Sequence, residues 1–249
     1  MRKPVMAGNW KMYKTPAETT AFFAKFVPLV AATRGREIVI AAPYIDLSAA
    51  LEATRGSNVE IGAQDLFWEK EGAFTGQVSA EMLKAVGAQW VLVGHSERRQ
   101  YFGETDETVY KRTVAALNAG LKPIVCVGEL LADREAGRTN EVLKTQFTGG
   151  LAPLTPEQFA AVVVAYEPVW AIGTGKTATP QIASDAHASI RELAASKFGK
   201  AAGDSLRILY GGSVKPENAK ELMSQEQIDG VLVGGASLKP EGFAAIVNF

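Results

Sequence analysis

Cysteine is nearly missing from this sequence of 249 residues, which contains Cys126 alone. A lone cysteine excludes an intrachain disulfide, so a reducing compartment is expected. An excess of one charge is missing too, because 26 Lys and Arg residues face 27 Asp and Glu residues, for a net charge of −1. Such a chain has no broad field with which to bind nucleic acid or an anionic membrane surface. Any anionic ligand must be held by a few well-placed groups.

Long apolar segments are also missing. The longest run, Phe159 to Tyr166, is far shorter than the ~20 residues that a transmembrane helix requires. The N-terminus begins with basic residues but lacks the apolar core of a secretory signal. No spacing of His, Cys and carboxylates suggests a metal site, and no dinucleotide-binding G-x-G-x-x-G follows an early strand. The sequence therefore predicts a cytoplasmic protein that binds neither metal, nucleic acid nor membrane.

What the sequence has instead is an alternation of short apolar runs with helical patterns. Runs such as 161–165 are apolar throughout, which is typical of parallel strands covered on both faces. Strands are predicted at residues 5–10, 37–42, 59–64, 90–94, 122–127, 161–166, 206–210 and 230–233. Eight strand–helix units without a polar linker predict a single α/β domain over residues 1–249, a (β/α)8 barrel. A doubly wound open sheet is the competing architecture, although no amphipathic edge strand can be identified.

Capping residues mark the helix boundaries. Thr179-Pro180 opens a long helix that Gly199 ends, and a shorter helix is predicted between Ser79 and Gly87. Another helix begins at Thr105 and runs to Gly120.

Polar and glycine-rich segments follow the strands, where barrel enzymes carry their chemistry. Gly211-Gly212 and Gly234-Gly235 let backbone N–H groups approach a ligand closely, each pair just before a predicted helix. A phosphate bound in this way needs no basic patch. Two ordinary tight turns are the alternative interpretation.

The segment 172–177, Ile-Gly-Thr-Gly-Lys-Thr, invites comparison with a nucleotide-binding loop. That loop requires a glycine five positions before Gly175, where this chain has Trp170, so nucleoside-triphosphate binding is rejected. Glycines that flank an apolar centre instead predict a mobile lid that closes over a site and excludes water.

The sequence contains two histidines. His187 lies beside the apolar stripe of its helix and is expected at the surface. His95 follows a buried strand and precedes Ser96, which is expected to cap a short helix from Glu97. The positive end of that helix would favour a neutral imidazole, which can still donate a hydrogen bond to a substrate oxygen. A purely structural capping histidine is the alternative.

Glu167 is the strongest catalytic candidate. It ends a strand as apolar as 162–165, and a closing lid would desolvate it and raise its basicity. A structural ion pair with a neighbouring lysine or arginine is the alternative.

Six motifs together resemble the triosephosphate isomerase family. They occupy residues 7–11, 72–76, 93–99, 165–176, 210–213 and 233–238, so the resemblance spans essentially the whole chain. It implies a TIM barrel that interconverts dihydroxyacetone phosphate and glyceraldehyde 3-phosphate, a step of glycolysis and gluconeogenesis, without cofactor or metal.

The resemblance also implies a role for each site residue. Glu167 would move the proton, neutral His95 would polarise the carbonyl, and Lys11 would supply a fixed positive charge with a further hydrogen bond from Asn9. Glu97 resembles the carboxylate that accompanies this lysine and histidine in the family. The residues expected to hold the phosphate through backbone N–H groups are Gly173, Ser213, Gly234 and Gly235.

The family is usually an obligate dimer. A protruding loop, here Trp68 to Ser79 with Thr75 at its tip, would enter the partner near its Lys11 and His95. The chain departs from the family here, with Asp65 where Asn is usual. It also has Gln77 where the family has a Glu that can face Arg98 of the partner.

Two other function classes fit the same fold. An imine-forming aldolase needs a lysine buried at a strand end, where only Lys11 is a candidate, and a metal-dependent epimerase needs histidine clusters, which are missing. A non-catalytic phosphosugar-binding barrel would lack the base, the histidine or the lysine, and this chain has all three.

Overall fold

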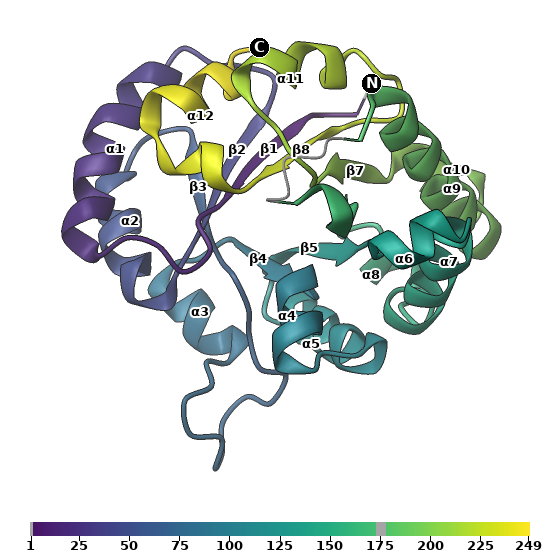
Figure 1. Ribbon diagram of the computed structural model, residues 1–249. Coiled ribbons are helices and arrows are strands. Elements are labelled where there is room, and N and C mark those ends of the chain that lie inside the picture. The colour runs from purple at the N-terminus through teal and green to yellow at the C-terminus, as the bar shows by residue number, and fades with distance from the viewer. Residues whose placement is uncertain (1, 173–177) are drawn as a thin grey trace.

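The computed structural model describes residues 2–172 and 178–249 (Figure 1). Within these residues, eight parallel strands pair in chain order and close into a barrel. The strands are β1 (Val5–Asn9), β2 (Glu37–Ala42), β3 (Val59–Ala63), β4 (Trp90–Val93), β5 (Lys122–Val127), β6 (Val163–Tyr166), β7 (Arg207–Tyr210) and β8 (Gly230–Val233). The predicted barrel is confirmed, and the open sheet is excluded because β1 pairs with β8.

Helices surround the barrel on the outside (Figure 1). The α-helices of the described residues are α1 (Pro16–Val30), α2 (Leu47–Ala53), α3 (Ala80–Val86), α4 (Ser96–Phe102), α5 (Asp106–Asn118), α6 (Leu131–Glu135), α7 (Thr139–Gly150), α8 (Pro156–Phe159), α9 (Pro180–Phe198), α10 (Lys200–Ser205), α11 (Pro216–Met223) and α12 (Pro240–Val247). Short 3-10 helices are η1 (Tyr44–Asp46), η2 (Val169–Ala171) and η3 (Gly235–Leu238). In the part of the chain that is described, no helix is long and apolar enough to cross a membrane.

The strands are apolar on both faces because they separate two packed layers. Alternate residues such as Val39, Leu92 and Ala165 form one cluster inside the barrel. Their neighbours, such as Ile38 and Val91, pack outwards against the helices in a second, larger cluster. Two-sided burial therefore explains the continuous apolar runs.

The closing seam between β1 and β8 requires a glycine. Gly230 has a φ of +147°, and a β-carbon there would lie 2.0 Å from the carbonyl oxygen of Val5. A residue with a side chain could not come so close to Val5, so β1 and β8 pair at a glycine.

The predicted helix caps are largely confirmed. Thr179 accepts a hydrogen bond from the N–H of Ile182 at the start of α9, which ends before Gly199. Ser79 caps α3, which ends at Gly87 in the left-handed region with a φ of +109°. Strand β6 begins two residues later than predicted, because Val162 still donates to Phe159 in the turn that ends α8.

Two expectations were wrong. His187 is fully buried rather than at the surface, because its ring packs edge-on against Tyr166 at 5.8 Å and its Nδ1 lies 3.0 Å from the Gln227 carbonyl. Burial lowers the pKa of His187 to about 3, so the ring is neutral. Ser96 does not cap α4 but is its first residue, and the capping acceptor is His95 Nδ1.

Candidate active site

The carboxyl ends of the strands bring most of the predicted site residues around one cavity. This cavity has a volume of about 250 Å³. Predicted residues on its wall are Asn9, Lys11, His95, Glu167, Ser213, Gly234 and Gly235. Glu97 lies beside it, in an adjoining hollow that it shares with Asn9, Lys11 and His95. Gly173 and the centre of the predicted lid lie outside the described residues.

Lys11 adopts a backbone conformation that is unusual for a residue with a side chain, with a φ of +54°. Two amides hold it there: Lys11 N–H donates to Asn9 Oδ1 at 2.9 Å, and Gln64 Nε2 donates to the Lys11 carbonyl at 2.9 Å. The Lys11 ammonium is then 2.5 Å from Glu97 Oε1. The cation is thereby fixed at the mouth of the barrel instead of extending into solvent.

His95 is buried at the end of β4 and is held by hydrogen bonds on both ring nitrogens. Its Nδ1 accepts from the N–H of Glu97 at 3.2 Å, so this nitrogen carries no proton. Its Nε2 lies 2.8 Å from Glu167 Oε1 and is therefore the donor. The arrangement defines a neutral imidazole whose Nε2–H is donated to Glu167 on the cavity wall.

Glu167 follows β6 and is 2 % exposed. Besides the contact with His95, its Oε2 accepts from the N–H of Ser96 at 2.9 Å. The Glu167 side chain has room because residue 211 is a glycine: a β-carbon at Gly211 would lie 2.9 Å from Glu167 Cγ. A buried carboxylate with two donors is thus poised beside the cavity.

The electrostatics of this pair depend on how close the two groups lie. Burial opposes the charge on Glu167, but the adjacent His95 and the Ser96 N–H outweigh it and hold the pKa of the carboxyl below its usual value. Burial likewise opposes protonation of His95, but the Glu167 carboxylate outweighs it and raises the pKa of the ring. The ring is neutral in this arrangement, because a protonated Nδ1 could not accept the hydrogen bond from the Glu97 N–H.

The glycine-rich loops after β7 and β8 also line the cavity. A β-carbon at Gly212 would lie 2.3 Å from the Tyr210 hydroxyl, and one at Gly234 would lie 3.4 Å from Lys11 Cε. A helix was predicted directly after each glycine pair. Gly235 is the first residue of η3, as predicted, whereas α11 begins three residues after Ser213.

Sequence reasoning assigned no role to two polar residues near this cavity. Gln64 follows β3, and its Nε2 donates hydrogen bonds to both the Lys11 and the Ala41 carbonyls. Glu129 is fully buried and accepts hydrogen bonds from the Tyr166 hydroxyl at 3.0 Å and from Trp170 Nε1 at 2.9 Å. The sequence does indicate a role for Glu129, because a carboxylate two residues after the apolar run of β5 needs buried hydrogen-bond donors.

No group of three or more His, Cys, Asp or Glu side chains within residues 2–172 and 178–249 could hold a metal ion. The fold and the grouping of a carboxylate, a histidine and a lysine at the strand ends place the chain among the (β/α)8-barrel enzymes.

The comparison with known proteins is more specific. The sequence profile of the family described as triosephosphate isomerase matches residues 4–249. The chain is 68 % identical over 249 residues to the triosephosphate isomerase of Solibacter usitatus, with 100 % of both chains covered. It is 57 % identical to that of Citrifermentans bemidjiense, covering 100 % of this chain and 99 % of the relative. The crystal structure of triosephosphate isomerase from Bartonella henselae superimposes with a TM-score of 0.89 at 39 % identity, covering 99 % of this chain and 98 % of that one. The chain belongs to the triosephosphate isomerase family, and it is an isomerase.

Proposed function

We propose that the chain interconverts dihydroxyacetone phosphate and D-glyceraldehyde 3-phosphate by proton transfer through an enediolate, with Glu167 as the base. The observation that carries this proposal is the buried Glu167 carboxylate, 2.8 Å from the Nε2 of a neutral His95, on the wall of a cavity that also contains Lys11. These are the three groups that a ketose–aldose isomerisation needs: a base, a hydrogen-bond donor to the carbonyl and a fixed cation.

The placement of these groups supports the following proton transfers. Glu167 removes the proton from the carbon next to the carbonyl and returns it to the neighbouring carbon, so the carboxylate is regenerated. His95 Nε2–H donates to the carbonyl oxygen and then relays protons between the two oxygens. Lys11 and Asn9 stabilise the negative charge that develops on the enediolate. No metal or cofactor is part of the proposal.

In its position beside His95 and Ser96, the Glu167 carboxylate has a lowered pKa and is a weaker base. Both carboxylate oxygens are bound, one to His95 and one to the Ser96 N–H. When the side chain leaves these donors for the substrate, burial remains while the favourable contacts are lost, so the pKa of the carboxyl rises. The same movement removes the carboxylate that raises the pKa of His95, which keeps the ring neutral.

The phosphate is proposed to bind at the wall formed by Ser213, Gly234 and Gly235, with Gly173 added from the lid. Backbone N–H groups at such a site bind an anion without a cluster of basic side chains, which agrees with the balanced charge of the chain. The Lys11 side chain, beside Gly234, adds the positive charge.

The experiment that tests the proposal is Glu167→Gln, assayed in both directions with a chelator present. We expect kcat to fall by at least the roughly 10²–10⁴-fold that a general base contributes. KM should change little, because the phosphate-binding groups stay in place. Glu60→Gln is the matched control, since Glu60 binds Trp90 Nε1 at 2.6 Å from the opposite end of the barrel. A near-native rate for Glu167→Gln would refute the assignment.

We also propose that the chain works as a homodimer through the loop Trp68–Ser79. Figure 1 shows this loop, between β3 and α3, extending away from the barrel, and residues 71–77 at its tip are exposed. Large apolar side chains are exposed beside the catalytic lysine and at the end of α4, among them Met12 at 94 % and Phe102 at 67 %. A second copy that inserted Thr75 there would cover this surface.

A further inference from the structure

Gly128, the residue that follows β5, lies directly against the main chain of Glu167. A β-carbon at Gly128 would be 1.7 Å from the Glu167 carbonyl oxygen and 2.6 Å from its carbonyl carbon, so only glycine fits. Hydrogen bonds flank this contact: Glu167 N–H donates to Val127 at 2.7 Å, and Val169 N–H donates to Glu129 at 3.1 Å. The main chain of the base is therefore positioned by residues 127–129.

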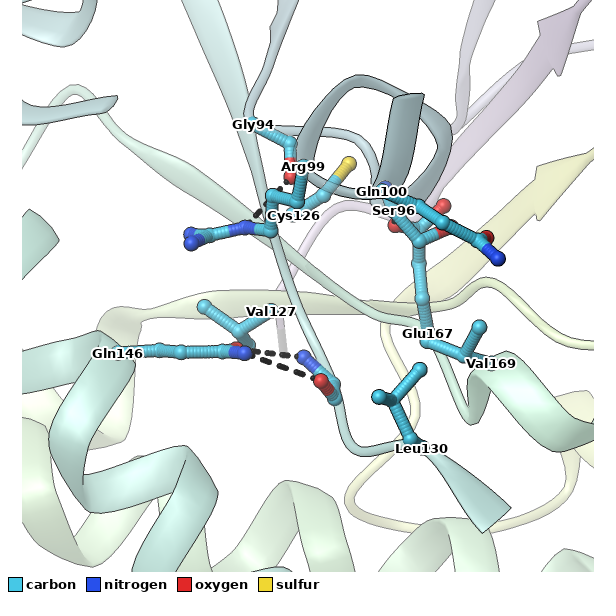
Figure 2. A pocket seen from close by; sticks show the side chains of 11 residues that line it. Gly94, Ser96, Arg99, Gln100, Cys126, Val127, Leu130, Gln146, Glu167 and Val169 are labelled. Carbon is cyan, nitrogen blue, oxygen red and sulfur yellow. Dashed lines mark hydrogen bonds between the residues drawn. The ribbon is translucent and has the colours of Figure 1, made fainter. Parts of the chain in front are cut away.

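The polar groups of Gly128 itself are bound by a side chain from α7. Gly128 N–H donates to Gln146 Oε1 at 2.7 Å, and Gln146 Nε2 donates back to the Gly128 carbonyl at 3.1 Å. Figure 2 draws both bonds as dashed lines from Gln146. The carbonyls of Val127 and Glu129 thus accept hydrogen bonds from the chain that follows β6. Gly128, between them, is bound by a side chain of α7, which lies outside the barrel.

Gln146 does not act on the reacting groups directly. A cavity of about 320 Å³ lies between β4, β5 and β6, and in Figure 2 Gln146 stands on one side of it while Glu167 and Val169 stand on the other. The connection runs through the Gly128 peptide. Gln146 is itself anchored, because its neighbours Leu143 and Phe147 on α7 are buried.

A primary amide is the side chain that suits this task. It accepts from an N–H and donates to a C=O at once, so it matches both groups of Gly128. Glutamate at position 146 could accept from the N–H, but its carboxylate would then face the Gly128 carbonyl. Leucine has a similar volume and satisfies neither group.

We propose that Gln146 is a positioning residue for the isomerisation, holding the Gly128 peptide and through it the main chain from which the Glu167 carboxylate reaches the substrate. The inference rests on the proposed role of Glu167 as the base. Because a base misplaced by about 1 Å can lose roughly 10²-fold in rate, we expect Gln146→Leu to lower kcat by about 10- to 100-fold. KM and the competitive inhibition constant of inorganic phosphate should stay within about twofold, since Gln146 binds Gly128 after β5, whereas Ser213, Gly234 and Gly235 line the other cavity.

The test compares Gln146→Leu with Gln158→Leu, a matched control. Gln158 also uses its amide oxygen to accept from a backbone N–H, that of Thr155 at 3.0 Å, but it lies on α8 away from the base. The control should retain native kcat. A kcat for Gln146→Leu within twofold of native would overturn the proposal, and so would a fall that comes with an equal loss of phosphate inhibition.

Gln146→Glu provides a second measurement, which also decides the matter if the leucine variant does not fold. Its carboxylate lacks the donor for Gly128, but protonation restores one. We expect the ratio of its kcat to that of the native enzyme to rise as the pH falls from 8 to 5.5, and a ratio independent of pH would overturn the proposal. The outcome is separable from the role of the base: a native rate for Gln146→Leu with an inactive Glu167→Gln leaves the proposed function standing.

Discussion

Replacing Asp65 by Asn tests whether burial or ion pairing dominates in the charged cluster behind the protruding loop. Asp65 follows β3, and its side chain is 8 % exposed. One oxygen lies 2.8 Å from Arg98 Nη2 and the other 3.1 Å from Arg112 Nε. Glu104 competes for the same two arginines, since it pairs with Arg98 and lies 3.4 Å from Arg112 Nη2.

Burial is the larger influence on Asp65. Together with the negative charge of Glu104 it raises the pKa of Asp65 from 3.8 to about 6, against the attraction of Arg98 and Arg112. The hydroxyl of Tyr44 on η1 interacts with the same carboxyl: desolvation of the hydroxyl, together with the negative charge of Asp65, raises the pKa of Tyr44. The folded chain thus holds the Asp65 proton more tightly than the unfolded chain does.

The direction of the pH effect follows from this shift. Because the folded pKa is the higher one, ionised Asp65 destabilises the fold above pH 6, and stability is regained as the pH falls through 6 towards 3.8. A shift from 3.8 to about 6 corresponds to about 3 kcal/mol. Asn resembles the neutral acid, so Asp65→Asn should raise the free energy of unfolding at pH 8 by up to about 3 kcal/mol. The gain should shrink to less than about 1 kcal/mol near pH 4.

The assay is urea unfolding of both proteins at pH 8, 6 and 4, at one protein concentration because the proposed dimer would unfold in a concentration-dependent way. Asp133→Asn is the control, since Asp133 pairs at 2.7 Å with the half-exposed Arg138 and such pairs contribute roughly 0–1 kcal/mol. If Asp65→Asn lowers stability at pH 8, the two arginines outweigh burial and the reasoning is wrong.

Two further outcomes are expected from the proposed site and assembly. Inorganic phosphate and a two-carbon phospho-acid should inhibit competitively with the triose phosphate, because they occupy the wall formed by Ser213, Gly234 and Gly235; purely non-competitive inhibition would argue against that wall. Sedimentation should show a dimer that Thr75→Arg converts to monomer with at least a tenfold loss of activity, because a buried unpaired charge at the loop tip is unfavourable; an active monomer would contradict the proposed assembly.

The barrel could be predicted from the sequence because its determinants are local. The strand segment 123–127 is apolar on both faces, and Thr179 and Gly199 mark the ends of α9 wherever that helix packs. The place of Glu167 on the cavity wall was predictable for a similar reason, since a carboxylate directly after an apolar strand needs an explanation in any barrel. Patterns of neighbouring residues were sufficient in these cases.

Other features depend on contacts between distant segments. His187 was misplaced because the Tyr166 ring that covers it comes from β6 and the carbonyl that it meets belongs to Gln227. Ser96 looked like a cap, but the imidazole before it supplies the acceptor and leaves the Ser96 N–H for Glu167. No periodicity encodes such pairings, because each depends on which segments the closed barrel brings together.

The seam between β1 and β8 determines when the site can exist during synthesis. Lys11 lies near the beginning of the chain and Gly234 near its end, and the indole of Trp10 donates to the Ser237 carbonyl at 3.2 Å across the same seam. A ribosome must therefore translate the whole segment from Lys11 to Gly234 before the first strand meets its last neighbour. Until then the edges of β1 and β7 have no partner, and unpaired edges are where nascent chains aggregate. The two walls of the cavity can thus face each other only after both ends of this segment have been synthesised.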